Sequence, residues 1–282
     1  MNFRVCSTLS YDVFSTTTFF FNIQAIQSAN QIILDESLII TPAIAFQEFT
    51  LNHSDTRFIK MEVVKGMSFT INYKAQVVVS PVRIEEKTLL KSMPIMNLDH
   101  EVLPYISPSR HCESDKLMEF ATKEFGFLPD DYSKVLAIED WIFANICYTT
   151  GSTNSSASAT DTLLHKTGVC KDFAHLGIAL CRALDVPARY FTGYASHLNP
   201  PDFHACFEAY IGGQWIIFDP TKLAGLNGLV KIANGKDASE VAVASYFGDI
   251  RCTQMNIQCH PVTTDFIPFD WKTRRGDAIS YL

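Results

Sequence analysis

Cys170, His204 and Asp219 are the residues of this sequence whose types and spacing best support covalent chemistry. A cysteine thiolate is a nucleophile, an imidazole can take up and return its proton, and a carboxylate can fix the orientation and tautomer of that imidazole. Such a set attacks a carbonyl carbon and forms a covalent intermediate on sulfur. The three residues form a site only if the elements that carry them bring the side chains together.

Cys170 lies at the predicted start of a helix that is apolar around most of its circumference. Gly168 precedes it, the apolar run extends to Leu184, and Asp185 and Pro187 end the run. A helix of this kind belongs in the centre of a domain. The unpaired N–H groups and positive partial charge at a helix start stabilise a thiolate and can serve an oxyanion. The alternative is a small buried structural cysteine, and the helix position alone does not decide between the two.

Two predicted strands joined by a Gly-Gly turn carry His204 and Asp219. A two-residue turn at 212–213 sets a register in which Cys206 lies opposite Asp219. Because side chains alternate between faces, His204 then shares a face with Asp219 as a diagonal neighbour, with Cα atoms about 7–8 Å apart. A shift of one residue would place them on opposite faces. The hairpin therefore predicts that the imidazole and the carboxylate can form a hydrogen bond.

Two domains are predicted, residues 1–107 and residues 108–282. The first contains runs rich in β-branched and aromatic residues between polar turns, which is typical of an antiparallel β domain. The runs are residues 16–23, 31–41, 58–64 and 69–79. The second begins with a helical pattern from Leu117 to Phe125 and contains the candidate site.

Within the second domain, periodic apolar residues predict a helix over 133–145 with Ser133 as its N-cap. Residues 149–160 are rich in Ser, Thr, Asn and Ala and are predicted to form a loop, either a surface connector or one side of a substrate site. A strand is expected over 188–194. Residues 252–282 are expected to add a final strand or to wrap the domain.

Composition favours a soluble globular protein whose partners are proteins, peptides or small amides. The 30 acidic residues outnumber the 23 basic ones and give a net charge of -7, which argues against nucleic-acid binding and offers no polybasic membrane patch. The first residues lack the pattern of a signal peptide, and the apolar patch 19–21 is too short to span a bilayer. A cytoplasmic location is therefore expected.

The eight cysteines are scattered without a disulfide framework and are expected to be reduced thiols, with Cys181 and Cys206 in the core. Cys252 with Cys259 and His260 is an incomplete zinc set, so neither a metal nor a cofactor is expected. Three further residues are expected to pack against the domain and to lie in a solvated turn rather than to contact a partner. These are Trp271, Arg274 and Arg275.

Three blocks in order resemble the transglutaminase-like superfamily, particularly bacterial members with a β-rich N-terminal region. They are Thr-Gly-Val-Cys-Lys-Asp-Phe-Ala-His-Leu at 167–176, Arg-Ala-Leu-Asp-Val-Pro-Ala-Arg-Tyr at 182–190 leading to Gly193 and Tyr194, and His204 with Ala205 followed by Trp215 and Phe218 to Thr221. The resemblance implies an α+β fold in which an antiparallel β domain precedes a papain-like core, with a central helix packed on an antiparallel sheet.

The resemblance also implies roles for the three candidate residues. Cys170 would attack a carboxamide or peptide carbonyl, His204 would accept and then donate the proton, and Asp219 would orient His204. Release of the acyl-thioester to water gives an amidase or protease, and release to an amine gives a transamidase. Both stay open, as does a catalytically silent binding or scaffold protein on the same fold. A third reading gives the N-terminal domain the task of binding a partner.

Other residues near the motifs receive more limited expectations. Cys206 stands where family members often carry Trp. Tyr148 and Thr149 are candidate oxyanion donors beside the backbone N–H of Cys170. His175, on the same helix, is a rival base that is expected to pack inside the domain instead. Structural roles are expected for Asp172, Arg189 and Tyr190.

Overall fold

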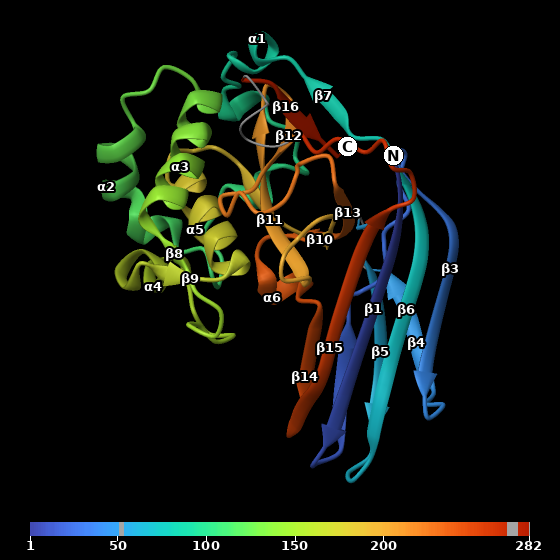
Figure 1. Cartoon of the computed structure of the whole chain (residues 1–282). Coiled ribbons are helices and arrows are strands. Elements are labelled where there is room, and N and C mark those ends of the chain that lie inside the picture. Colours follow the sequence, from blue (N-terminus) through green and yellow to red (C-terminus); the bar gives the residue numbers. More distant parts are fainter. Residues whose placement is uncertain (51–53, 270–275, 282) are drawn as a thin grey trace.

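The computed structural model describes residues 1–50, 54–269 and 276–281. Its fold is mixed, with antiparallel sheets on one side and a group of helices on the other, as the sequence predicted (Figure 1). Two four-stranded sheets form the β-rich part of the molecule. A third four-stranded sheet lies beside the helices.

The β-rich part consists of the sheets β15-β1-β6-β3 and β14-β2-β5-β4. The strands are β1 (Asn2–Val13), β2 (Thr17–Phe21), β3 (Gln31–Thr41), β4 (Phe46–Thr50), β5 (Arg57–Val63), β6 (Ser68–Val79), β14 (Ala244–Phe247) and β15 (Ile250–Pro261). Every second residue of β1 and β6 is buried, as expected for strands with one face on a core. The ring of Tyr11 lies 5.4–5.7 Å from those of Phe19, Phe21 and Phe69, so aromatic side chains fill the space between the sheets.

The four predicted runs of the first domain correspond to β2, β3, β5 and β6. Strand β1 was not predicted. The prediction for residues 108–282 requires a correction, because β14 pairs with β2 and β15 pairs with β1. The chain therefore returns to the N-terminal sheets after the helical part. Met255, Ile257 and Cys259 alternate with polar residues, which is typical of a strand but does not indicate which strand β15 pairs with. The boundary at 107/108 stays a prediction.

The helical part surrounds a central helix that packs on the sheet β12-β11-β10-β13. Its elements are α2 (Ser114–Phe125), α3 (Asp131–Asn145), β8 (Cys147–Tyr148), α4 (Ala159–His165), β9 (Thr167–Gly168), α5 (Cys170–Arg182), β10 (Ala188–Ala195), β11 (Phe203–Ile211), β12 (Gln214–Phe218), β13 (Leu229–Gly235) and α6 (Ala238–Val241). The predicted central helix is α5. Connecting elements are β7 (Val82–Ile84), α1 (Glu86–Leu89), the 3-10 turns η1 (Ile95–Asn97) and η2 (Leu103–Tyr105), and β16 (Ala278–Ser280).

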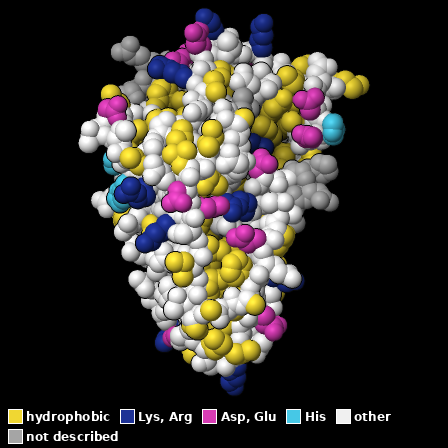
Figure 2. Space-filling model, turned by 90° about the vertical axis from the view of Figure 1, so that its right-hand side faces the viewer, with side chains coloured by type: hydrophobic (Ala, Val, Ile, Leu, Met, Phe, Trp, Pro, Cys, Tyr) yellow, Lys and Arg dark blue, Asp and Glu magenta, His cyan; other side chains and the backbone are white. Residues whose placement is uncertain are grey.

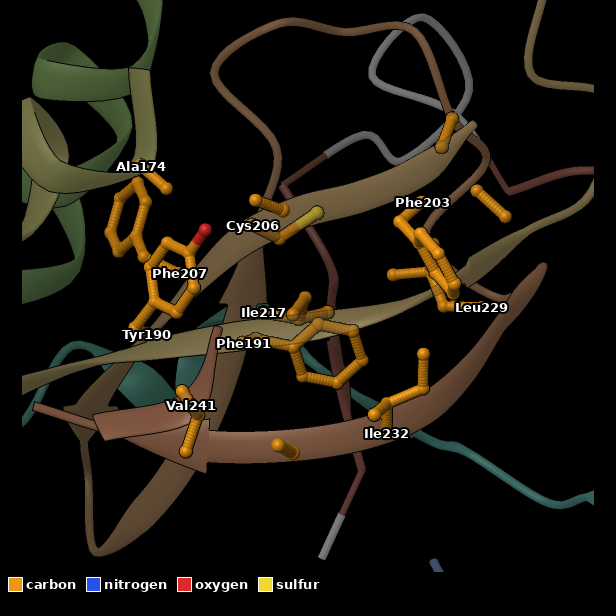
Figure 3. Packing of buried hydrophobic residues seen from close by; sticks show 14 of the residues in the cluster. Ala174, Tyr190, Phe191, Phe203, Cys206, Phe207, Ile217, Leu229, Ile232 and Val241 are labelled. Carbon is orange, nitrogen blue, oxygen red and sulfur yellow. The ribbon is translucent and has the colours of Figure 1, made fainter. Parts of the chain in front are cut away.

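Helix α5 lies close against the sheet because it carries a glycine at the contact. A Cβ at Gly177 would lie 2.5 Å from the ring of Phe207 on β11, so any side chain there would push the helix away. Figure 3 shows Phe207 and Tyr190 beside Ala174 of α5, whereas Phe191 points to the other side of the sheet. The two faces of this sheet therefore have different neighbours.

Several local predictions can be compared with the structure. The predicted helix 133–145 begins at Asp131, and its N-cap is Asp130 rather than Ser133. The Asp130 carboxylate accepts a hydrogen bond from the Ser133 N–H at 2.8 Å, so the prediction of Ser133 was wrong. The predicted loop 149–160 ends at Ser158, which caps the unpredicted helix α4. The predicted strand 188–194 is confirmed as β10.

Direct hydrogen bonds join the two parts of the molecule. The Tyr194 hydroxyl on β10 lies 3.0 Å from the Ser7 hydroxyl and donates to the Ile23 carbonyl at 2.6 Å. The face seen in Figure 2 narrows toward one end and carries interspersed hydrophobic and charged side chains. Among the helices of the described residues, none is long and apolar enough to cross a membrane.

Candidate active site

Cys170 is the first residue of α5, as predicted. The Asp172 carboxylate accepts a hydrogen bond from the Val169 N–H at 2.9 Å and another from the Thr153 hydroxyl at 2.6 Å. Asp172 thus caps the helix and ties its start to the polar loop, which confirms the structural role expected of it. Cys170 is partly exposed at the position where the helix dipole favours negative charge.

The segment before Cys170 is held by a short parallel ladder. Cys147 and Tyr148 of β8 pair with Thr167 and Gly168 of β9. A Cβ at Gly168 would lie 2.7 Å from the Cβ of Asp172, so only glycine allows the chain to pass this close to the cap. The chain just before Cys170 is therefore held by β8 on one side and packed against Asp172 on the other.

His204 and Asp219 lie together as the hairpin register predicted. Ile211 pairs with Gln214, and the ladder continues to Phe207 opposite Phe218. The His204 Nε2 and the Asp219 Oδ2 are 2.9 Å apart, and both side chains are buried. The structure thus brings the imidazole and the carboxylate into direct contact.

Further groups hold the Asp219 carboxylate in place. Its Oδ1 accepts hydrogen bonds from the Thr221 hydroxyl at 2.7 Å and the Thr221 N–H at 3.1 Å, and its Oδ2 also accepts from the Ala224 N–H at 3.1 Å. The Asp219 N–H donates to the buried Glu139 carboxylate of α3 at 3.0 Å. No role for Glu139 was predicted from the sequence. An acidic residue on the buried side of a helix was the signal that could have identified it.

The charges of this pair stabilise each other. Burial alone would lower the pKa of His204, but the Asp219 carboxylate and contacts with neighbouring thiols raise that pKa well above its ordinary value. Burial alone would raise the pKa of Asp219, but the His204 charge and the hydrogen bonds from Thr221 and Ala224 hold it below its ordinary value. The Asp219 carboxylate therefore favours the protonated, charged form of the His204 ring.

The thiols of Cys170 and Cys206 both lie close enough to His204 to influence its pKa or be influenced by it. Because Nε2 of His204 bonds Asp219, Nδ1 is the ring nitrogen left for Cys170. Cys206 is completely buried, as predicted, and burial raises the pKa of its thiol to about 12. Cys181 is also completely buried, and all eight cysteines are free. Cys206 is thus a neutral thiol beside the partly exposed Cys170.

The two residues considered as oxyanion donors differ in position. Burial and then the Cys170 thiol raise the pKa of the Tyr148 hydroxyl to about 12, and the nearby Cys170 backbone N–H opposes this rise. The Thr149 hydroxyl instead donates to the Cys147 sulfur at 3.6 Å. Tyr148 therefore lies beside the candidate nucleophile, whereas Thr149 is committed elsewhere.

His175 packs inside the domain, as expected. Its ring stacks on His111 with centroids 5.0 Å apart and lies 4.9 Å from the Tyr190 ring. Its Nε2 accepts a hydrogen bond from the Ala238 N–H at 3.1 Å, and burial followed by the His111 charge lowers its pKa to about 3. A ring that accepts a hydrogen bond and stays neutral in this way is a structural residue.

One set of side chains among the described residues has the composition of a metal site. His204, Cys206 and Asp219 offer ligand atoms that lie within 4.8 Å of one another. However, the atoms of His204 and Asp219 already satisfy each other through their hydrogen bond. The geometry fits a hydrogen-bonded pair without any ion. Trp271, Arg274 and Arg275 lie outside the described residues.

Comparison with known proteins agrees with this architecture. Residues 1–101 match the N-terminal domain of bacterial transglutaminases, and residues 119–220 match the transglutaminase-like superfamily. A solved structure titled a "putative cysteine protease" from Cytophaga hutchinsonii is 52% identical, covers 100% of this chain and 98% of its own, and superimposes with a TM-score of 0.97. The chain belongs to the transglutaminase-like superfamily. Its α+β fold is that of this family member.

Curated relatives are more distant. An uncharacterized protein of Mycobacterium leprae is 28% identical over 167 residues, which cover 55% of this chain and 57% of the relative. An uncharacterized protein of Mycobacterium bovis is 30% identical over 154 residues, which cover 49% and 46%. The chain thus spans about half the length of the curated relatives it matches.

Proposed function

We propose that this protein performs cysteine-dependent amide chemistry through an acyl-thioester on Cys170. The observation that carries the proposal is the side-chain contact of Cys170, at the start of α5, with His204, which is in turn bonded to Asp219 at 2.9 Å. A nucleophile, a proton carrier and an orienting carboxylate in this order form the arrangement used for acyl transfer. The Cytophaga hutchinsonii relative, which is described as a cysteine protease, supports the same reaction class.

In the proposed resting state, His204 holds the proton of Cys170. The raised pKa of His204 favours an imidazolium, and the helix start favours the thiolate. The thiolate attacks the carbonyl carbon and forms the C–S bond. When the C–N bond breaks, His204 donates its proton to the leaving amine. Water or a second amine then attacks the thioester, with His204 as base, and the Cys170 sulfur leaves.

The backbone N–H of Cys170 is the proposed oxyanion donor, with Tyr148 beside it. This N–H lies near enough to the Tyr148 hydroxyl to influence its pKa. A substrate oxygen that accepts from this N–H would have the Tyr148 O–H beside it as a second donor. Two donors at the reacting oxygen would then stabilise the charge that develops there.

Hydrolysis is proposed over transamidation as the normal outcome, with a protein, peptide or small amide as substrate and the cytoplasm as the location. The N-terminal domain is proposed to bind a substrate or partner. The competing proposal is a binding or scaffold protein without turnover. The two proposals differ in one measurable property, the reactivity of the Cys170 thiol, because a scaffold does not need an activated thiol.

The deciding experiment measures the rate of iodoacetamide alkylation at Cys170 against pH, with peptide mass spectrometry to separate Cys170 from the other cysteines. We expect rapid labelling well below pH 8, slowed on the order of tenfold or more in His204→Ala. His100→Ala removes an exposed histidine and is the matched control, for which we expect an unchanged profile. An ordinary thiol profile in both variants and the wild type would support the scaffold instead.

A second assay separates the two enzymatic outcomes. Peptide amides are incubated with and without a fluorescent primary amine, and free amine and amine-labelled product are measured. Hydrolysis releases acid in either case, whereas a transamidase transfers label to the acyl group. Cys170→Ala is expected to abolish both signals.

A further inference from the structure

A second candidate site lies on the opposite face of the sheet from α5. Tyr190 and Phe207 pair across β10 and β11 and face the helix, so the next pair, Arg189 and Glu208, points to the other face. A pocket of about 250 Å³ lies there, between the sheet and residues of the N-terminal β domain. Arg189 and Lys231 both line it.

Two cations in this pocket share one buried carboxylate. Arg189 Nε donates to the Glu208 Oε2 at 2.6 Å, and Asn234 Nδ2 donates to the same oxygen at 2.8 Å. Lys231 Nζ lies 3.7 Å from the Glu208 Oε1, which is beyond hydrogen-bond distance. Glu208 is fully buried and neutralises only one of the two positive charges. The inner end of the pocket is therefore positive.

Three donor groups at this end make no hydrogen bond among the described residues, although Lys231 Nζ is ion-paired with Glu208 at 3.7 Å. Only Nε of Arg189 makes a hydrogen bond there, which leaves the two terminal amino groups of the guanidinium, and Lys231 Nζ makes none. The Arg189 guanidinium lies 4.0 Å from the centre of the Trp215 ring, which fixes its plane. A fixed guanidinium fork beside an ammonium group matches the two oxygens of a carboxylate.

The pocket is preformed, because its wall is bound to the N-terminal domain. The Gln31 side chain accepts from the Lys231 N–H at 2.7 Å and donates to the Lys231 carbonyl at 2.8 Å. The Ile26 N–H donates to the same carbonyl at 3.1 Å. With its backbone held by three hydrogen bonds, Lys231 projects a side chain that is more than nine-tenths buried.

The lining of the pocket also includes a second acidic residue, Asp55, which differs from Glu208 in its exposure. Asp55 is exposed, whereas Glu208 is buried beneath the two cations. A ligand with only negative charge would be repelled by Asp55. A ligand with a carboxylate at one end and an ammonium group at the other satisfies both ends, and a pocket of this volume accommodates one small molecule.

We propose that this pocket binds a free α-amino acid, with its carboxylate on Arg189 and Lys231 and its ammonium group on Asp55. The proposal does not depend on the reaction at Cys170. It assigns a ligand to a junction where the sheet that carries His204 meets the N-terminal domain. Trp215 and Tyr105 supply apolar walls for the side chain of the amino acid.

Isothermal titration calorimetry of the full chain with L-alanine, acetate and L-alaninamide tests the proposal. All proteins carry Cys170→Ala, so that no signal comes from turnover and failure of the proposed function does not affect the result. We expect L-alanine to bind, acetate to bind several-fold more weakly, and L-alaninamide, which lacks the carboxylate, to give no measurable binding.

Two substitutions locate the binding. Lys231→Met is expected to weaken L-alanine binding by about tenfold or more, because it removes a charge-assisted hydrogen bond. Asp55→Asn, at an exposed position, is expected to reduce L-alanine binding to the level of acetate, about two- to fivefold. Asp35→Asn, an exposed residue of β3 outside the pocket, is the matched control and should change neither affinity.

Several results would overturn the proposal. They are the absence of L-alanine binding, equal affinity for L-alanine and acetate, and an unchanged preference for L-alanine in Asp55→Asn. Tighter binding of inorganic phosphate than of L-alanine would also overturn it, since the site would then select anions in general. If Lys231→Met does not fold, the Asp55→Asn comparison still decides.

Discussion

The surroundings of His204 and His175 differ although both rings are buried in the same domain. His204 on β11 contacts Asp219, and its pKa lies well above its ordinary value. His175 on α5 stacks on His111 and accepts an N–H from Ala238, and its pKa is about 3. Burial lowers the pKa of both rings, so burial does not explain the difference.

The partner of each ring decides its protonation state. A carboxylate at 2.9 Å outweighs the desolvation of His204, whereas a backbone N–H requires an unprotonated nitrogen on His175. Cys170 and His175 lie on the same helix, yet of the two histidines only His204 combines a raised pKa with a position beside the Cys170 thiol. The comparison explains why we propose His204 as the proton carrier.

The largest effect is expected when the carboxylate beside His204 is removed. Asp219→Asn should lower the rate of turnover at Cys170 by a factor on the order of 10²–10⁴, because His204 then loses its charge partner and its orientation. The pKa of His204 should fall toward that of a buried, unpaired ring, which NMR titration measures. Asp140→Asn, an exposed position on α3, should change the rate less than twofold. Equal rates in both variants would contradict the proposed role.

The two histidines should have opposite effects on stability as pH changes. The folded-state pKa of His175 is lowered from 6.5 to about 3, so the unfolded chain binds more protons between these values and stability is lost as pH falls through them. The loss is at most about 1.4 kcal/mol per pH unit. Urea denaturation of wild type and His175→Phe at pH 4–7 tests this, and the difference between them should shrink as pH falls. A constant difference would be inconsistent with a neutral His175.

For His204 and Asp219 the signs differ. The raised pKa of His204 stabilises the fold fully below its ordinary value of 6.5, and this contribution is lost as pH rises through the folded value. The lowered pKa of Asp219 stabilises the fold fully above 3.8, and this contribution is lost as pH falls through the folded value. The pair should therefore stabilise the protein most between pH 3.8 and 6.5, as the difference between wild type and His204→Ala can measure.

A smaller effect is expected at Thr221, whose hydroxyl donates to Asp219 Oδ1 at 2.7 Å. Thr221→Val removes this bond but keeps the size of the side chain and the backbone N–H that also reaches the carboxylate. The expected loss is about 1–3 kcal/mol of unfolding free energy, with a rate decrease on the order of tenfold. Thr149→Val is the matched control, because its hydroxyl contacts Cys147, and it should leave the rate nearly unchanged.

Local signals in the sequence predicted the main geometry of the candidate site. Gly168 and the apolar run after it placed Cys170 at a helix start, and the Gly-Gly turn fixed the register that joins His204 to Asp219. Both depend on residues close together in the chain. Whether the three residues catalyse a reaction stays a prediction.

Other features depend on contacts between distant segments, and the sequence did not reveal them. Glu139 of α3 reaches the Asp219 backbone across 80 positions of the chain. The N-cap of α3 was misplaced by three residues, from Asp130 to Ser133, because both are favourable caps and only the backbone conformation distinguishes them. Pairing of β15 with β1 could not be predicted from β15, since the alternation of Met255, Ile257 and Cys259 with polar residues indicates a strand but not its partner.

That last pairing affects how the chain can fold as it is synthesised. Strand β1 lies between β6 and β15, so its edge on the β15 side has no strand beside it until residues 250–261 leave the ribosome. An open strand edge is a template for wrong pairing. The helical core can be complete earlier, because α5, β10, β11 and β12 follow one another closely. The last long strand to be synthesised is therefore the one that completes the sheet begun by the first.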